Sequence, residues 1–420
     1  MENTKIGGRG IMEGDKKQKK SIGIWLPNFD TFEMNKCYGQ IALGLFELGA
    51  DVALLTSGKG EIHSFNNSDD YDATKLRVIG SIENSEAKNI FSEFDYVIMY
   101  TWFAKNLTNW VKEAKESGCK VILKLDHNGK FGTRETLVHS SQKYIIRNFW
   151  RIEYILKVPR LVLKNLLVFS STKFKRNFFK HLIVQAELAD RIIIESPHAA
   201  YNLVTIFGDL GVHDLIEKIR VIPNPVSPSF SRSAISNVYK ENLVVAVGRW
   251  NDEAPKNPKD LVRTIVEFLS KKNNWKVVII GPGEDILQNY IKKYSPDKFV
   301  ASKIQVVGRL KNEDIIRYLV KSKIILSSSR WESFGIAAAE ALCLGNTLVG
   351  PRIESFEYLS NLGFSGTLAL SHNWKDLLAT LIYESELWKK GQRNPEEIAN
   401  FWREILDRKM IAQKFLDILE

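Results

Sequence analysis

Short runs of aliphatic and β-branched residues alternate along this chain with longer segments in which apolar residues recur every three or four positions. The short runs are typical of strands buried on both faces, and the longer segments are typical of amphipathic helices. This alternation predicts parallel sheets with helices on both faces, an α/β class. The predicted strands are 22–26, 51–56, 95–101, 119–125 and 191–195, then 243–247, 276–280, 304–307, 323–327 and 347–349.

The alternation is interrupted by residues 221–229, which contain three prolines. Proline fixes its own backbone and lacks an N–H, so no regular element continues through this segment. We therefore expect two doubly wound domains, over residues 21–235 and 240–395, after a disordered tail over 1–20. Residues 396–420 carry an apolar stripe at helical spacing and are expected to form one helix. Ligands of such folds bind at the carboxyl ends of the strands, which places the active site between the two sheets.

The chain carries a formal net charge of +10, and the excess lies in one segment. Residues 130–181 hold 12 Lys or Arg and 2 Asp or Glu, whereas the charges of the remaining chain balance. Basic, aromatic and aliphatic residues are interleaved there, which suits the headgroup region of an anionic membrane. The expected membrane contacts are Arg147, Trp150, Arg151, Lys157, Arg160 and Lys164. A helix with a solvated basic face and a nucleic-acid site are the alternatives, although we find no nucleic-acid recognition module.

The run of residues 327–345 combines a strand end, a loop and a helix start. Three serines end the strand, Glu332 lies in the loop, Gly335 opens the helix, and Glu340 lies in its early turns. Unpaired N–H groups at a helix N-terminus favour phosphate, and carboxylates accept hydrogen bonds from sugar hydroxyls. The run predicts a site for a phosphorylated sugar. A helix cap and a solvated helix residue are the plain alternative for the two glutamates.

A second run places two cations after a strand. Gly248 follows the strand 243–247, and Arg249 and Lys256 lie on the loop beyond it. Two cations at the carboxyl end of a strand suit a diphosphate, although solvated loop residues show the same pattern.

Taken in order, these motifs resemble those of retaining glycosyltransferases of the GT-B fold, most closely the glycogen-synthase-like family 4, also described as glycosyl transferases group 1. The resemblance covers about residues 190–360, and the N-terminal half agrees only in its alternation of strands and helices. It implies two facing Rossmann-like domains, of which the first binds the acceptor and the second binds the nucleotide sugar. The helix at 396–420 would pack back toward the first domain. The matching residues are Pro223, Asn224, Gly248, Arg249, Lys256, Gly308, Arg309, Glu332, Phe334, Gly335, Glu340, Ala341 and Gly345.

The resemblance also implies a role for each residue of a donor site that begins at Gly248. Arg249 and Lys256 would bind the donor diphosphate and stabilise the leaving group, and Glu332 would bond the hydroxyls of the donor sugar. Phe334, Gly335 and Ile336 would present backbone to the sugar and phosphate. Glu340 would bond the ribose, and Arg309 would lie near the nucleobase.

The chain departs from the family pattern in three places. Arg249 and Lys256 are further apart than usual, and residues 27–36 replace the glycine-rich first loop. The His or Asp that the family places after its fourth strand corresponds here to Asp126 and His127. Either residue could face the anomeric centre, and ordinary loop positions are the alternative for both.

Several motifs are better explained as turns than as cofactor sites. Asp70 and Asp72 form a DxD pattern in a polar stretch, and Gly281 and Gly283 flank a proline without the Lys and Ser or Thr of a phosphate-binding loop. The seven histidines show no metal-ligand spacing, so we expect neither metal nor cofactor. Three scattered cysteines without a CxxC pair indicate a reducing compartment.

Together, the residues and the family that they resemble imply a cytoplasmic, metal-independent, retaining glycosyltransferase, peripheral at the inner face of the cell membrane. It would move a sugar from a nucleotide-diphosphate sugar to a membrane-proximal or lipid-linked glycan, in cell-surface polysaccharide or glycolipid synthesis. We expect neither a secretory signal nor a stretch of about 20 apolar residues that could span a bilayer. A GT-B nucleotide-sugar epimerase and a non-catalytic nucleotide-sugar-binding protein are the alternatives. The motifs do not specify the base, sugar, acceptor, linkage or oligomeric state.

Overall fold

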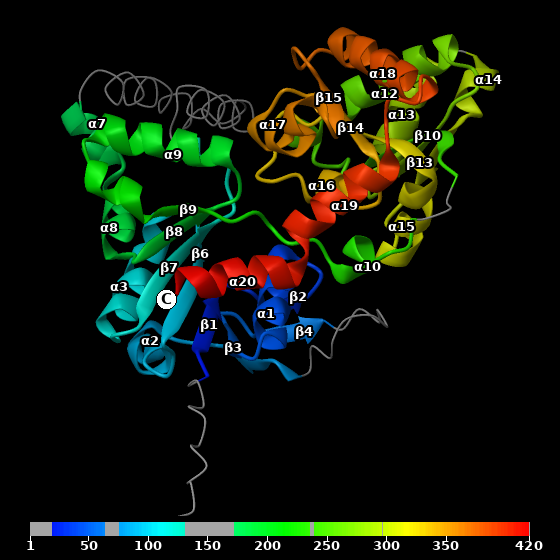
Figure 1. The fold of residues 1–420 in the computed structure, drawn as a ribbon. Coiled ribbons are helices and arrows are strands. Elements are labelled where there is room, and N and C mark those ends of the chain that lie inside the picture. Colours follow the sequence, from blue (N-terminus) through cyan, green and yellow to red (C-terminus); the bar gives the residue numbers. More distant parts are fainter. Residues whose placement is uncertain (1–18, 64–74, 131–171, 236–238, 296, 420) are drawn as a thin grey trace, which may run out of the picture.

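The computed structural model describes residues 19–63, 75–130, 172–235, 239–295 and 297–419. In these residues two parallel sheets, of seven and six strands, are each covered by helices on both faces (Figure 1). The predicted α/β class with two doubly wound sheets is confirmed. We call the part up to residue 221 the first half and the part from residue 228 to residue 406 the second half.

The first sheet has the strand order β5-β3-β1-β6-β7-β8-β9, and each neighbouring pair is parallel. A separate two-stranded sheet pairs β2 with β4. The elements of the first half are β1 (Ser21–Trp25), β2 (Thr31–Glu33), α1 (Cys37–Glu47), β3 (Asp51–Leu55), β4 (Glu61–His63), β5 (Arg77–Ile79), α2 (Asn84–Phe91), β6 (Tyr96–Thr101), η2 (Lys105–Leu107), α3 (Thr108–Glu116), β7 (Lys120–Leu125), α7 (Thr172–Phe178), α8 (Lys180–Leu188), β8 (Arg191–Ile194), α9 (Pro197–Leu210), η3 (His213–Lys218) and β9 (Ile219–Val221).

The second sheet has the order β12-β11-β10-β13-β14-β15 and is also parallel throughout. The elements of the second half are α10 (Pro228–Ser231), β10 (Glu241–Val247), α11 (Glu253–Lys256), α12 (Pro258–Lys271), β11 (Lys276–Ile280), α13 (Glu284–Tyr294), α14 (Lys298–Ala301), β12 (Ile304–Val307), α15 (Asn312–Lys321), β13 (Ser322–Leu326), α16 (Ile336–Leu342), β14 (Thr347–Pro351), α17 (Glu354–Ser360), η4 (Asn361–Gly363), β15 (Gly366–Ala369), α18 (Trp374–Lys389) and α19 (Pro395–Leu406).

Each sheet buries apolar side chains on both faces, as expected for strands that are apolar throughout. On the first sheet, α1 and the last helix, α20 (Arg408–Ile418), cover one face, and α2, α3, α8 and α9 cover the other. On the second sheet, α16, α17 and α19 cover one face, and α12, α13 and α18 cover the other. This layering leaves the ends of the parallel strands as the places where polar groups can gather.

The prediction of one helix over residues 396–420 is wrong, because the chain forms α19 and α20 there. Asp407 between them has an extended ψ of 136°, and its carboxylate accepts a hydrogen bond from the N–H of Lys409 at 2.9 Å. The helix α19 packs beside α16 in the second half, and only α20 packs on α1 of the first (Figure 1). Gly44 allows this approach, since a Cβ there would lie 2.6 Å from the carbonyl oxygen of Arg408.

The two connections between the halves lie side by side. Val226, in the proline-rich linker, donates from its N–H to the carbonyl of Leu406 at 2.9 Å and forms a parallel bridge with Asp407. Asn224 of the same linker is 4% exposed, so this segment is buried rather than a free tether. The contact between the two connections restrains how the halves can move relative to each other.

Candidate functional site

The central strands of the second sheet bring together two of the predicted donor residues. Lys256 ends α11 after β10, Glu332 follows β13, and these two strands are hydrogen-bonded neighbours. Lys256 Nζ lies 2.5 Å from Glu332 Oε1, although 76 positions separate the residues in the chain. Each side chain is 17% exposed, so the pair is accessible to a ligand.

Three hydrogen bonds hold the loops that carry this pair. Ser329 Oγ donates to Glu332 Oε1 at 2.6 Å, and Ser328 Oγ donates to the carbonyl of Lys256 at 2.7 Å. The N–H of Arg330 donates to the carbonyl of Pro255 at 2.8 Å. The serines at the end of β13 therefore fix the two loops to each other and orient the ion pair.

Gly248 lies at the carboxyl end of β10, in close contact with the loop after β11. Gly281 on that loop has a φ of 119°, and a Cβ there would lie 1.9 Å from the carbonyl oxygen of Gly248. Trp250 is buried and donates from Nε1 to the carbonyl of Ile280 at 3.0 Å. Between these anchored residues, Arg249 is exposed, and no other described residue bonds or pairs with its guanidinium. Its charge is therefore available to an anion.

The turn into α16 is anchored by aromatic packing. Gly335 has a φ of 82°, and Phe356 lies 2.9 Å from where its Cβ would be, so a larger residue is excluded. Phe334 is buried, whereas Ile336 is exposed. This arrangement keeps the backbone of the turn at the surface, next to the loop that carries Glu332.

Glu340 lies on α16 and faces a charge from the first half. Burial raises the pKa of Glu340 to about 8, against the lowering effect of the Lys36 ammonium. Lys36 precedes α1 and is exposed. Glu340 is therefore protonated at neutral pH, and a ligand that bonds its carboxylate would have to displace a proton.

Arg309 follows β12, the edge strand of the second sheet, and β11 lies between that strand and β10. Its side chain is exposed. Among the described residues, no hydrogen bond or ion pair joins Arg309 to the other predicted site residues. A position beside a nucleobase stays a prediction for this residue.

In the first half, Asp126 and His127 follow β7. Glu195 of its own half and Ser333 of the second half both act on the Asp126 carboxyl group. Loss of hydration raises the pKa of Asp126, but the interactions with Glu195, Lys124 and Ser333 outweigh it and hold the pKa below its usual value. The structure thus links Asp126 to the loop between Glu332 and Gly335.

The neighbouring His127 is a neutral imidazole. Its Nδ1 accepts a hydrogen bond from the N–H of Gly129 at 3.1 Å. Burial lowers the pKa of His127 to about 4, although the charge of Asp126 acts in the opposite direction. At neutral pH the pair therefore consists of a carboxylate and an uncharged ring, and the ring proton lies on Nε2.

Sequence reasoning missed a buried polar cluster behind Asp126. Lys124 Nζ lies 3.3 Å from Glu195 Oε1, and both side chains are fully buried. Asn224 of the linker donates from Nδ2 to the same oxygen at 2.6 Å. The signal was present in the sequence: a lysine inside one apolar strand and a glutamate at the end of another both require buried partners.

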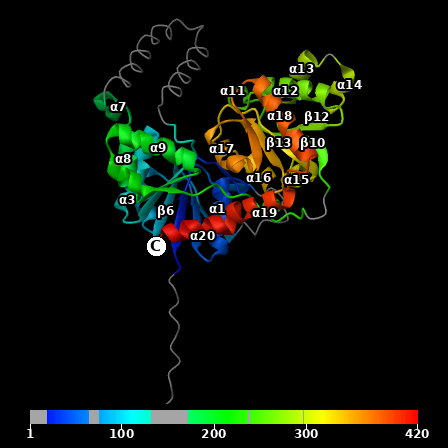
Figure 2. The ribbon, with the colours of Figure 1, turned by 45° about the horizontal axis from the view of Figure 1, so that its top comes forward.

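Two side-chain contacts join the two halves beside these residues. Lys130 Nζ lies 2.5 Å from Glu354 Oε1 at the start of α17. His198 Nε2 on α9 lies 3.7 Å from Glu357 Oε2 on α17. Figure 2 shows α9 and α17 facing each other from the two halves. Asp126 and Glu340 therefore lie near the boundary where the two halves contact each other.

Some predictions fall elsewhere in the chain. Arg147, Trp150, Arg151, Lys157, Arg160 and Lys164 lie outside the described residues, as do Asp70 and Asp72. In the described part of the chain, no helix is long and apolar enough to cross a bilayer. The same part contains no group of three or more His, Cys, Asp or Glu side chains that could hold a metal ion.

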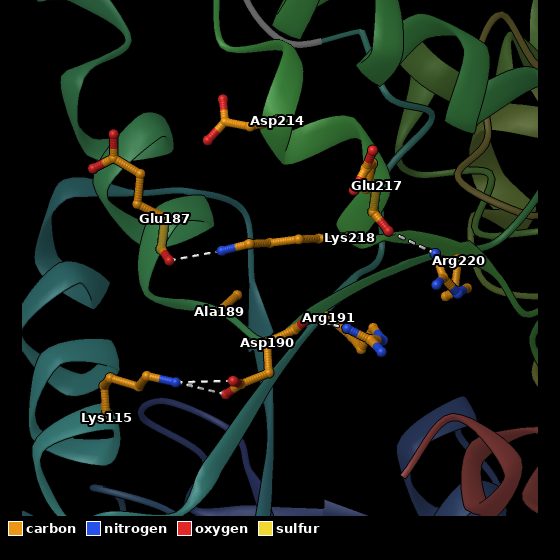
Figure 3. Close-up of a pocket in the computed structure, with 9 residues that line it drawn as sticks. All are labelled: Lys115, Glu187, Ala189, Asp190, Arg191, Asp214, Glu217, Lys218 and Arg220. Carbon is orange, nitrogen blue, oxygen red and sulfur yellow. Dashed lines mark hydrogen bonds and ion pairs between the residues drawn. The ribbon is translucent and has the colours of Figure 1, made fainter. Parts of the chain in front are cut away.

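A hollow of about 760 Å³ lies at the opposite, amino edge of the first sheet (Figure 3). Its cations are engaged by neighbouring groups. Lys115 Nζ contacts both carboxylate oxygens of Asp190 at 2.9 Å, and Lys218 donates to the carbonyls of Ala186 and Glu187 at 3.2 and 2.8 Å. This hollow lies away from every predicted site residue, so we place the candidate site at the carboxyl edge instead.

Comparison with known proteins connects the second half to a family. Residues 230–399 match the family described as "Glycosyl transferases group 1". The chain is 32% identical over 120 residues to tRNA-queuosine alpha-mannosyltransferase of Drosophila melanogaster. This matched stretch covers 27% of this chain and 30% of that protein. It is 23% identical over 228 residues to D-inositol 3-phosphate glycosyltransferase of Corynebacterium jeikeium (strain K411). This second match covers 48% of this chain and 54% of that protein. The chain thus spans about a third and about half of these two curated relatives.

The fold of the whole chain is similar to that of a solved structure. The structure of Anabaena Alr3699/HepE in complex with UDP-glucose has a TM-score of 0.61 and 12% identity, and it covers 95% of this chain and 99% of that chain. At this identity the likeness concerns the fold alone. It confirms the GT-B fold that the motifs predicted.

Proposed function

The chain belongs to the glycosyl transferases group 1 family, and on this premise we propose that it moves a hexose from a nucleotide-diphosphate sugar to a glycan, with retention of configuration. One observation carries the proposal: the Lys256–Glu332 pair, which places a cation for phosphate beside a carboxylate for sugar hydroxyls. The exposed Arg249 adds a second cation at the same strand end. Within this proposal, residues 240–395 bind the donor and residues 21–235 bind the acceptor.

The chemistry that these groups support is departure of a nucleoside diphosphate. The bond between the anomeric carbon and the phosphate oxygen breaks through an oxocarbenium-like state, and negative charge builds on the phosphate. Arg249 and Lys256 stabilise that charge as it develops. The acceptor oxygen bonds to the anomeric carbon from the same face, and its proton passes to the departing phosphate. These protein groups need no metal ion to act in this way.

Asp126 and His127 contribute from the acceptor side. A carboxylate near the anomeric centre stabilises positive charge on the sugar ring, and the uncharged His127 can bond a hydroxyl without adding a repelling charge. The influence of Ser333 on the Asp126 carboxylate supports this placement, because Ser333 lies next to Glu332. Gly248, Arg309, the turn Phe334–Gly335–Ile336 and Glu340 complete the donor site in this proposal.

The acceptor in this proposal is lipid-linked or membrane-proximal, and the protein is a peripheral one at the inner face of the cell membrane. The support is the charge of residues 130–181, in the half that would bind the acceptor. Neutralising Arg147, Arg151, Lys157 and Arg160 together should release the protein from anionic vesicles. Binding that is insensitive both to this change and to salt would contradict membrane contact.

The test of the proposed function is transfer of label. The purified chain is incubated with donors labelled in the sugar, together with a membrane extract as the acceptor source. Label that moves into solvent-extractable or glycan material, in the donor's anomeric configuration, supports the proposal. Label that stays on the nucleotide as a changed sugar indicates an epimerase. Donor binding without any turnover, in the presence of this extract, indicates a non-catalytic binding protein.

A further inference from the structure

The polar cluster behind Asp126 lies where apolar side chains would be expected. Lys124 is the fifth residue of β7, and its side chain is fully buried between neighbouring strands. The register pairs Lys124 with Ile193 of β8, so Glu195 extends from the end of the adjacent strand. A buried ion pair adds little stability compared with apolar residues of the same volume. A role beyond packing is therefore the better explanation of the pair.

The hydrogen bonds of the cluster are incomplete unless one carboxyl carries a proton. Glu195 Oε1 is engaged by Lys124 at 3.3 Å and by Asn224 at 2.6 Å, whereas Glu195 Oε2 is buried without a donor among the described residues. The carboxyl groups of Asp126 and Glu195 act on each other. Two carboxylates cannot bond each other, but a carboxylic acid can donate to a carboxylate.

We propose that Glu195 is a positioning residue of the transfer site: it carries a proton and donates it to Asp126, which is thereby held as a carboxylate toward Ser333 of the second half. The proposal rests on the proposed function, because it assigns the placement of a group in that site. One proton shared between Glu195 and Asp126 leaves a single negative charge, which balances Lys124.

The titration behaviour of the surrounding groups agrees with this assignment. Burial raises the pKa of Glu195 well above its usual value, while Lys124 lowers it and Asp126 raises it. In the described part of the chain, the other titratable groups that face the cluster are the neutral His127, Cys37 of α1 and Tyr100 of β6. Burial raises the pKa of Cys37 to about 12 and that of Tyr100 well above its usual value, so neither ionises near neutral pH.

Asn224 connects the cluster to the linker. Asn224 lies between two prolines and is buried, and its amide bonds the same Glu195 oxygen as Lys124. The position of Asp126 is thereby tied to the segment that joins the halves. Glu195 accordingly links the acceptor side of the site to the connection whose geometry sets how the two halves meet.

The first test separates positioning from packing. In the combined variant Lys124→Met and Glu195→Leu, an apolar pair replaces the buried lysine and the buried carboxyl group, so the variant should unfold at a similar urea concentration. It should bind nucleotide normally, because the donor residues lie in the second half. Its kcat/KM for the acceptor should fall by about 100-fold, the cost of a misplaced reacting group. A combined variant with wild-type transfer would overturn the proposal.

The second test isolates the proton. Glu195→Gln keeps a donor toward Asp126 and an acceptor for Asn224, so transfer should be retained, and the decline of kcat at alkaline pH should be reduced. A Glu195→Gln variant that loses as much transfer as the combined variant would overturn the proposal.

A third readout does not depend on turnover. The infrared band of a protonated carboxyl, recorded above the pKa of about 8 of Glu340, should disappear in Glu195→Gln. If wild-type protein transfers no sugar, the proposed function fails, and this band still decides whether Glu195 holds a proton. An unchanged band would reject the assignment of the proton.

Discussion

Lys256 and Glu332 neutralise each other in the structure, with Nζ and Oε1 2.5 Å apart. Under the proposed function, a donor would offer phosphate oxygens to the lysine and hydroxyls to the glutamate, so each side chain would exchange its present partner for one on the donor. Because both residues are partly exposed, the exchange does not require the loops to unfold. The pair is therefore a preorganised site in which the cost of orienting each side chain is already met.

Replacing Lys256 tests this arrangement. Lys256→Ala should lower kcat by about 100- to 1000-fold, because one group that stabilises the leaving phosphate is lost. Donor hydrolysis or transfer at saturating donor gives the measurement. The matched control is Lys259→Ala, which removes an exposed lysine three positions further along and should leave kcat unchanged. Equal losses in the two variants would mean that only the general charge of the loop matters.

Glu340 gives a pH-dependent prediction. Its pKa of about 8 means that the free protein holds a proton there at neutral pH, whereas hydroxyls of a ribose are bonded best by the carboxylate. Donor affinity should therefore rise with pH up to about 8, by at most about tenfold per pH unit, and then level off. Titration calorimetry across this range measures the dissociation constant and the proton release.

Two variants check the origin of that pH dependence. Glu340→Gln cannot ionise, so its donor affinity should be weaker at high pH and should lose the slope. Lys36→Met removes the charge that lowers the pKa of Glu340, so the levelling point should move to higher pH. If the donor affinity of Glu340→Gln still rises with pH, the proton belongs to another group.

At the scale of elements, the last two helices bind the two halves together. The helix α19 packs in the second half and α20 in the first, and the break at Asp407 turns the chain between them. Arg408 at the start of α20 is 2% exposed and pairs with Glu47 of α1. Arg408 Nη1 also donates to Gln40 Oε1 at 3.2 Å.

The contribution of the buried Arg408–Glu47 pair to the free energy of unfolding can be compared with that of the exposed Lys409. Arg408→Ala should lower the free energy of unfolding by about 3–5 kcal/mol, because Glu47 is left buried without its main partner. Lys409→Ala removes an exposed lysine that lies 4.0 Å from the same carboxylate, and it should cost less than about 1 kcal/mol. Urea unfolding followed by circular dichroism gives both values. Similar losses in the two variants would contradict the role given to burial.

The break at Asp407 also shows where sequence periodicity fails. The apolar stripe of residues 398–419 continues through Asp407, because α19 and α20 each bury their own part of it on a different sheet. A single helix and two consecutive helices therefore produce the same pattern. Strands that are buried on both faces, such as β10 and β11, were predicted nearly to the residue, whereas the three-residue strands β2, β4, β5 and β9 carry too few apolar residues to be recognised.

At the scale of the whole molecule, the candidate site draws on both halves. Ser333 influences Asp126, Lys36 influences Glu340, and Lys130 pairs with Glu354. The predicted donor residues each belong to a motif that is contiguous in the sequence, and their roles stay predictions. The partners of Asp126 could not be predicted, because Glu195 and Asn224 come from distant segments that only the folded sheet and the linker bring together.

The central claim is that the second half binds and activates a nucleotide-diphosphate sugar, and the most direct measurement is nucleotide release. The purified chain is incubated with uridine, guanosine and adenosine diphosphate sugars, with and without a chelator, and the free nucleotide is counted. We expect one donor to release its nucleotide, with a release that persists in the chelator and falls in Lys256→Ala. If no donor is bound and none releases its nucleotide, the claim is contradicted.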